Sequence, residues 1–105
     1  MARVLSVSFC VRAAALLNRL AGDEQTLRTL ERARSDSTMD FLHELSAAFD
    51  RSLDVGFTPA EQEQLLELYM KAMQLLLRAP EGVRLHFTVY PSGTLSSREV
   101  RSPAH

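Results

Sequence analysis

The amino-acid sequence predicts a mainly helical α+β fold built as one domain over residues 1–105. Two stretches with helical spacing of apolar residues, about 38–53 and 59–78, are joined by a short turn, which predicts an antiparallel helical hairpin. Residues 83–90 alternate between apolar and polar side chains, and after the turn at residues 91–93 the stretch 94–100 is expected to return as a second, poorer strand, which predicts a small β-hairpin or sheet. A chain of 105 residues is long enough for a single hydrophobic core.

The N-terminal segment, residues 1–34, has the least decisive pattern. Residues 5–11 alternate between apolar and polar side chains and are predicted to form a third strand with one buried face, followed by a helix. The alternative is one continuous helix from Ala2 to Leu20, because valine and serine tolerate either state. Asp23 is placed to cap a short polar helix that covers the rest of the segment.

The composition of this segment also raises the question of a targeting peptide. Residues 1–22 contain Arg3, Arg12 and Arg19 and no acidic residue, as mitochondrial presequences do. Residues 4–11 are apolar enough for a signal peptide, but Arg12 interrupts the run too early. We therefore expect the segment to belong to the fold. At the other end of the chain, residues 101–105 are expected to form a flexible tail.

The helix expected at 38–53 carries a single apolar stripe, and Ser37 with Asp40 forms a capping signature before it. Phe49 lies on this stripe. On the following helix, Tyr69 lies at the centre of the apolar surface. If the two helices pack antiparallel, these two aromatic side chains are expected to face each other.

The helix expected at 59–78 has the clearest boundaries in the chain. Thr58 is a suitable N-cap, and Pro59 occupies the first helical position, where its missing N–H has no cost. Glu61 lies three residues after the cap and completes a capping box. Pro80 then ends the helix.

This helix is apolar over an unusually wide arc of about 220°, whereas a helix resting on one core needs little more than about 100°. Either its own domain packs on both sides of it, or one flank contacts a second chain. Leu68 and Leu75 form one flank of the arc. We predict the other flank as the protein interface, because methionine adapts to varied surfaces. The predicted interface residues are Leu66, Met70, Leu77 and Met73.

Nothing in the sequence indicates catalysis, a metal or a cofactor. Cys10, the only cysteine, stands among apolar residues and is predicted to be a buried structural thiol, which suits a reducing compartment. The three histidines are too scattered for metal-ligand spacing. The net charge of −1 gives no general attraction to nucleic acid, although a few arginines form a candidate basic patch. These histidines and arginines are His43, His86, His105, Arg84, Arg98 and Arg101.

Residues 37–78, with their Thr58-Pro59-Ala60-Glu61 helix start and Leu/Met surface, resemble the small bacterial antiactivators of quorum sensing. The resemblance implies a cytoplasmic homodimer that occupies the dimerisation surface of a LuxR-type transcriptional activator and keeps that activator off DNA. We therefore expect a non-enzymatic regulator that binds a protein partner, without direct contact to nucleic acid or membrane. The alternative is a chaperone-like or structural subunit of a bacterial assembly such as a secretion apparatus.

Overall fold

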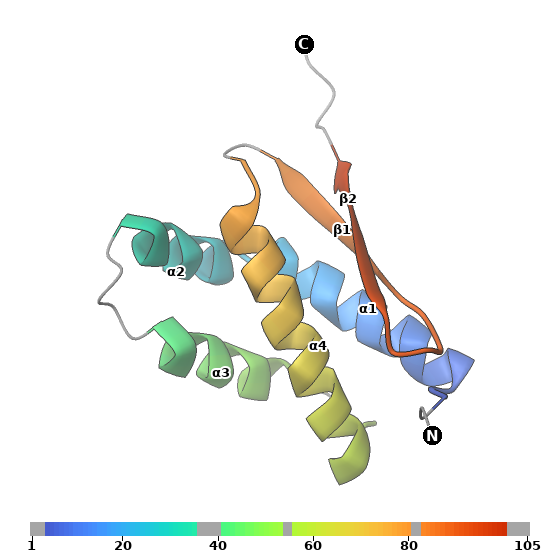
Figure 1. Cartoon of the computed structure of the whole chain (residues 1–105). Helices are drawn as coiled ribbons and strands as arrows, with labels where there is room; N and C mark the ends of the chain where they lie inside the picture. Colours follow the sequence, from blue (N-terminus) through green and yellow to red (C-terminus); the bar gives the residue numbers. More distant parts are fainter. Residues whose placement is uncertain (1–3, 36–40, 54–55, 81–82, 101–105) are drawn as a thin grey trace.

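The computed structural model describes residues 4–35, 41–53, 56–80 and 83–100. Helices come first in the chain, and an antiparallel two-stranded sheet follows them (Figure 1). The elements are α1 (Val7–Ala21), α2 (Glu24–Ser35), α3 (Phe41–Ser52), α4 (Pro59–Arg78), β1 (Arg84–Val89) and β2 (Leu95–Val100). The predicted class, mainly helical α+β, is confirmed.

Helix α4 crosses the middle of the molecule, with α2 and α3 on one side and α1 and the β-hairpin on the other (Figure 1). Its start is the one that the sequence predicts. The Thr58 hydroxyl accepts a hydrogen bond from the Glu61 N–H at 3.2 Å, and the Glu61 carboxylate accepts one from the Thr58 N–H at 2.9 Å. At its other end, the Arg34 guanidinium of α2 donates to the carbonyls of Leu76 and Leu77, which satisfies two of the free acceptors there.

One hydrophobic core takes side chains from all four helices and from β1. Phe49 and Tyr69 are buried with their rings 5.0 Å apart, as their positions on facing stripes predict. The Tyr69 hydroxyl donates to the Leu45 carbonyl at 3.0 Å, so that α3 and α4 are joined by a hydrogen bond inside the core. Burial raises the pKa of Tyr69 to about 12, and the negative charge of Asp23 adds to the shift.

Helix α3 lies closer to α2 than to α4 along its backbone. The Arg32 guanidinium of α2 forms an ion pair with Glu44 of α3 at 2.6 Å, and the Thr29 hydroxyl donates to the same carboxylate at 3.2 Å. Asp23 caps α2 as predicted, since its carboxylate accepts a hydrogen bond from the Thr26 N–H. The capping signature predicted before α3 lies outside the described residues.

The strand predicted at residues 5–11 is wrong, because α1 begins at Val7 and occupies most of this stretch. Ser6 is the N-cap of α1, and its hydroxyl accepts a hydrogen bond from the Phe9 N–H at 3.0 Å. The adjacent residues Phe9 and Cys10 are both buried, whereas a strand would place them on opposite faces. The alternative of a continuous helix comes closer, although α1 begins at Val7 and ends at Ala21.

The β-hairpin follows the predicted alternation. Phe87 and Val89 are buried, while Arg84 and His86 lie on the exposed face. Its turn contains Gly93, whose φ of 86° favours glycine. The expected tail at residues 101–105 lies outside the described part of the chain.

Candidate functional site

The predicted interface on α4 does not form one exposed surface. Met73 is the clearest correction, because it is only 1% exposed and belongs to the core. Met70 and Leu77 are half-buried and pack against that core. Leu66 is the most accessible of the four at 39%. The neighbouring helices therefore cover most of this flank.

The opposite flank of α4 is covered as well. Leu68 is buried and lines a small hollow together with Leu5, at the start of α1. Leu75 is half-buried against the core. The wide apolar arc is thus explained by the first of the two alternatives, a central helix packed on both sides by its own domain.

The most exposed large hydrophobic side chains that the structure describes lie at the start of α1. Val4 is 80% exposed, Val7 is 69% exposed and Val11 is 64% exposed. Ser8 and Ala15 are also exposed and share one side of α1 with Val7 and Val11, because their spacing places them on adjacent turns. We call these five residues the valine stripe: Val4, Val7, Ser8, Val11 and Ala15.

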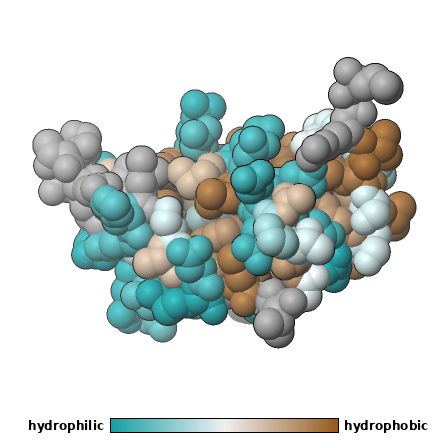
Figure 2. Space-filling model, turned by 90° about the horizontal axis from the view of Figure 1, so that it is seen from below, coloured by the Kyte–Doolittle hydropathy of each residue, from teal (hydrophilic) through white to brown (hydrophobic). Residues whose placement is uncertain are grey.

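The two sides of α1 differ less in polarity than those of an ordinary surface helix. Its buried side carries Phe9, Leu17 and similar residues, as expected for the face that packs on the core. The most exposed positions from Val7 to Ala15 carry no ionisable residue; Arg12, whose side chain is 39% exposed, borders them, and exposed Arg19 follows one turn after Ala15. Hydrophobic residues are visible at the surface on this side of the molecule (Figure 2). An exposed side with so few charged residues marks a candidate interaction surface.

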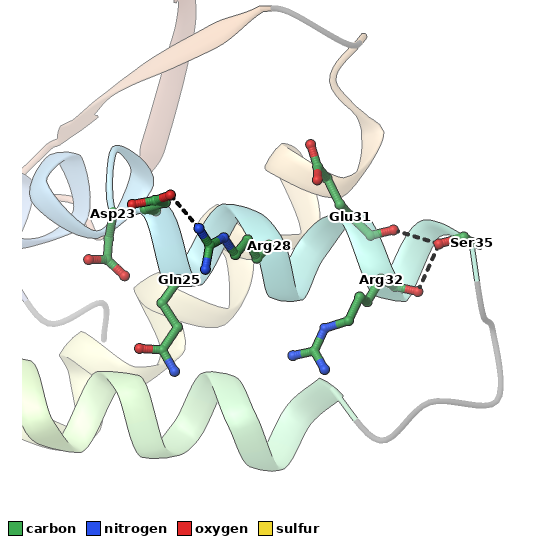
Figure 3. Close-up of a pocket in the computed structure, with 7 residues that line it drawn as sticks. Asp23, Gln25, Arg28, Glu31, Arg32 and Ser35 are labelled. Carbon is green, nitrogen blue, oxygen red and sulfur yellow. Dashed lines mark hydrogen bonds and ion pairs between the residues drawn. The ribbon is translucent and has the colours of Figure 1, made fainter.

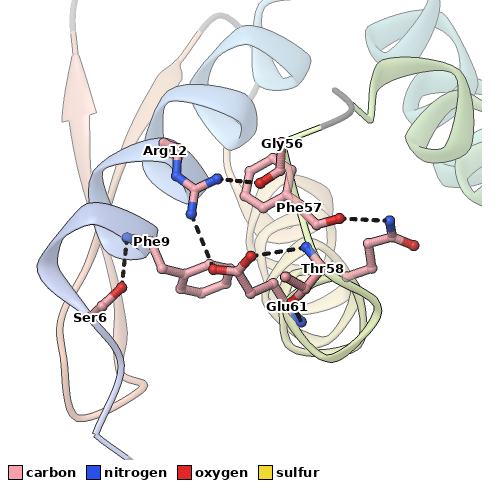
Figure 4. A network of polar contacts seen from close by, with 8 residues as sticks. Ser6, Phe9, Arg12, Gly56, Phe57, Thr58 and Glu61 are labelled. Atoms are coloured by element: carbon pink, nitrogen blue, oxygen red, sulfur yellow. Dashed lines mark hydrogen bonds and ion pairs between the residues drawn. The ribbon is translucent and has the colours of Figure 1, made fainter.

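Arg12 anchors the helix that carries the valine stripe (Figure 4). Its guanidinium donates to the Gly56 carbonyl at 2.7 Å, forms an ion pair with Glu61 at 3.1 Å, and lies 4.8 Å from the centre of the Phe57 ring. The hydrogen bond from the Thr58 N–H, with help from the charge of Arg12, lowers the pKa of Glu61. These contacts fix α1 to the N-terminus of α4, so the stripe is presented by a rigid element.

The other candidate residues do not assemble into a reactive site. Cys10 is buried as predicted, and burial raises the pKa of its thiol, which disfavours the reactive thiolate. Among the described residues, no group of three or more His, Cys, Asp or Glu side chains is close enough to hold a metal ion. Arg84 and Arg98 share the exposed face of the hairpin, while Arg101 and His105 lie outside the described residues.

A surface hollow of about 830 Å³ runs along α2 (Figure 3). All its lining residues belong to α2 or to the residue that caps it, and both of its arginines are already paired with carboxylates. Arg28 forms an ion pair with Glu24 at 2.6 Å, and Arg32 is held by Glu44. A hollow that is open along one helix and whose arginines are already paired offers little to a ligand.

Sequence reasoning missed the valine stripe because residues 5–11 were interpreted as a strand. The spacing of Val7 and Val11 by four residues was the available signal, since it places them on one side of a helix, and Val4 lies just before that helix. The role of Arg12 was missed too. An arginine inside an apolar run signals a buried or half-buried partner, but its partners are more than forty residues away in the chain.

Comparisons with protein-family models, with curated protein sequences and with solved structures found no match for this chain. In the part of the chain that the structure describes, no helix has both the length and the apolar character needed to cross a membrane.

Proposed function

We propose that this chain is a non-enzymatic regulator that binds a protein partner through the valine stripe of α1. The observation that carries the proposal is the exposure of Val7 and Val11 on the outer side of α1 and of Val4 just before it, with no fully exposed charged residue between Val4 and Ala15. A fully buried valine gains about 1.5 kcal/mol or more from leaving water, so three exposed valines represent a substantial driving force for association.

The shape of the stripe favours a helical mode of recognition. Anchors three and four residues apart fit the groove of a partner that accepts one side of a helix. Valine, serine and alanine are small, so a partner backbone can approach α1 closely. Because Arg12 holds α1 against α4, binding requires little ordering of the helix, which keeps the entropic cost low.

The specific version of the proposal is an antiactivator. In this version the valine stripe covers the surface through which a LuxR-type transcriptional activator dimerises, and the activator no longer binds DNA. The regulator acts in the cytoplasm, where its buried Cys10 stays reduced. Support for this version comes from the sequence resemblance, and support for the contact surface comes from the exposed valines.

A capture experiment with matched variants tests the proposal. The tagged wild-type chain, Val11→Glu and Leu27→Glu are used to capture partners from native lysate, and each protein is checked for folding by circular dichroism. Leu27 is the control because it is an exposed apolar residue on α2, at 39%, outside the valine stripe. We expect the wild type and Leu27→Glu to retain the same partner and Val11→Glu to lose it.

The identity of the captured protein then separates the versions. A LuxR-type activator whose DNA binding falls on addition of the wild-type chain, and not of Val11→Glu, supports the antiactivator. A secretion-apparatus subunit supports the chaperone-like alternative. A folded Val11→Glu variant that captures the partner as well as the wild type overturns the role of the valine stripe.

A further inference from the structure

The two outer edges of the small sheet differ in whether their backbone N–H and carbonyl groups have hydrogen-bond partners. The outer edge of β1 is closed by Asn18 of α1, whose side-chain amide accepts a hydrogen bond from the Phe87 N–H at 2.7 Å and donates one to the Phe87 carbonyl at 3.1 Å. The amide thus acts as a one-residue substitute for a neighbouring strand. Just beyond this strand, the Leu5 N–H donates to the Pro91 carbonyl at 2.7 Å.

The outer edge of β2 has no such cover. The N–H and carbonyl of Phe87 point away from β2, toward Asn18. Because Ser97 lies directly opposite Phe87 in this antiparallel pair, its N–H and carbonyl must also point away from β1. The same holds for Leu95 and Glu99, which lie two residues on either side. Among the described residues, these outward backbone groups have no hydrogen-bond partner. An open edge of this kind is a template for another strand.

A cationic groove lies beside this open edge. It has a volume of about 430 Å³ and runs between α4 and the start of β2, where Lys71, Arg78 and Leu95 contribute to its lining. None of its lining residues is acidic. No ion pair joins Lys71 or Arg78 to a carboxylate within the described ranges. A strand added to β2 therefore fits best if it brings a carboxylate to this end.

We propose that β2 pairs with β2 of a second copy of this chain, so that two hairpins form one four-stranded antiparallel sheet. With Ser97 on the two-fold axis, Leu95 of one copy lies opposite Glu99 of the other. Opposite residues in an antiparallel pair share a face of the sheet, so Glu99 of the second copy points to the side of Leu95, toward Lys71 and Arg78. The chain itself supplies the carboxylate that the groove lacks.

This register also avoids like charges. Arg98 lies opposite Ser96 of the second copy, whereas moving the axis to residue 98 or 99 would place two arginines or two glutamates opposite each other. A register shift of one residue, which puts the two-fold axis between two residues, is excluded because it would set outward backbone groups against inward ones. Paired strands of six residues bury less than the roughly 1,200 Å² of a standard interface. We therefore expect weak association, with a Kd in the micromolar range or above.

Disulfide trapping tests both the pairing and its register. In Ser97→Cys the two new thiols lie on the axis, where directly opposite Cα atoms are about 5.5 Å apart and can be bridged. In the control Arg98→Cys the thiols are diagonal neighbours about 7–8 Å apart, beyond ordinary disulfide reach. The native Cys10 is buried and does not interfere. We expect Ser97→Cys to form a covalent dimer on the order of ten-fold faster under mild oxidation.

Sedimentation velocity over a concentration series gives an independent readout. Ser97→Pro removes an N–H that the β1–β2 ladder does not use, so the hairpin should fold while the dimer is lost. Glu99→Lys and Lys71→Glu should each weaken the dimer, and the double variant should restore it. If Ser97→Pro alters the circular dichroism spectrum, and so the fold, the charge variants at Glu99 and Lys71 still test the dimer. Val11→Glu, on the valine stripe, should dimerise like the wild type.

Three results would overturn the proposal. These are a wild-type chain that stays monomeric up to millimolar concentration, Ser97→Cys and Arg98→Cys that cross-link at equal rates, and single charge variants that dimerise like the wild type. None of these results depends on the partner of the valine stripe, so the two proposals fail separately.

Discussion

Helices α1 and α4 both carry more apolar surface than a one-sided helix needs, yet the fold uses this surface in opposite ways. In α4, Leu68 and Met73 on the two flanks are buried by neighbouring elements. In α1, Val7 and Val11 remain exposed although the other side of the helix already packs on the core. The contrast teaches that a wide apolar arc indicates how much surface a helix must cover, and that the surrounding elements decide which part stays free.

The position of each helix in the molecule explains the difference. Helix α4 runs through the middle and is contacted by elements on both sides (Figure 1). Helix α1 lies at the side, where the β-hairpin and α4 occupy its inner face. Its outer face therefore meets solvent whatever residues stand there. Valines at such positions add little stability to the isolated fold, which is why we propose that they contact a partner.

The largest expected effect is the loss of the aromatic contact that covers the centre of α4. Phe49→Ala should lower the free energy of unfolding by about 3–5 kcal/mol, because it removes a buried ring packed on Tyr69 and leaves a cavity. Urea unfolding followed by circular dichroism measures this change. A loss below about 1 kcal/mol would mean that α3 does not cover α4 as described.

The next largest effect concerns the inner side of α1. Asn18→Ala should cost about 1–3 kcal/mol, because the N–H and carbonyl of buried Phe87 lose their partners. Hydrogen exchange of the Phe87 amide should accelerate together with this loss. An unchanged exchange rate at Phe87 would show that Asn18 does not close the edge of β1.

Removing the anchor of α1 should have a smaller effect. Arg12→Ala deletes the hydrogen bond to Gly56 and the contacts with Glu61 and Phe57, but the side chain is partly exposed, so we expect a loss of about 1–2 kcal/mol. Glu61→Gln is the matched control, because it weakens the ion pair and keeps the other two contacts. Equal losses in the two variants would mean that the contacts of Arg12 with Gly56 and Phe57 add nothing to stability beyond the ion pair.

The parts of the fold that depend on local signals could be predicted from the sequence. Thr58, Pro59 and Glu61 act within one turn, and they place the start of α4 correctly. Strand β1 also follows from local alternation, since its side chains alternate in burial every two residues, and β2 follows from the turn that precedes it. Residues 5–11 satisfy the same alternation, but the cap at Ser6 and the burial of two adjacent side chains favour a helix.

The candidate surfaces could not be predicted in the same way, because exposure depends on contacts between distant segments. Met73 is buried by the arrangement of the helices around α4, which no local pattern reports. The bond from Asn18 to Phe87 spans 69 residues, and that from Arg12 to Gly56 spans 44. The wide arc of α4 was visible in the sequence, but its covering neighbours were not.

The pH dependence of the free energy of unfolding further tests whether the Tyr69 hydroxyl of α4 is buried under α3. The pKa of Tyr69 is raised to about 12 in the folded state, above the ordinary value of about 10. The folded state therefore holds the phenolic proton more tightly, and its contribution to stability is complete below pH 10 and is lost as the pH rises toward 12. Urea midpoints between pH 9 and about 12 should fall for the wild type more steeply than for Tyr69→Phe. Parallel curves for the two proteins would show that the Tyr69 hydroxyl is not buried.

Urea unfolding of Val11→Glu beside Met70→Glu tests the contrast between the two helices most directly. Both changes place a carboxylate at an apolar helical position, and the main difference between them is how far the fold buries that position. Val11 is 64% exposed, and its variant should unfold within about 0.5 kcal/mol of the wild type. Met70 packs against the core, and its variant should lose at least about 1 kcal/mol. A Val11→Glu variant that is as destabilised as Met70→Glu would contradict the account, because the valine stripe would then be part of the core.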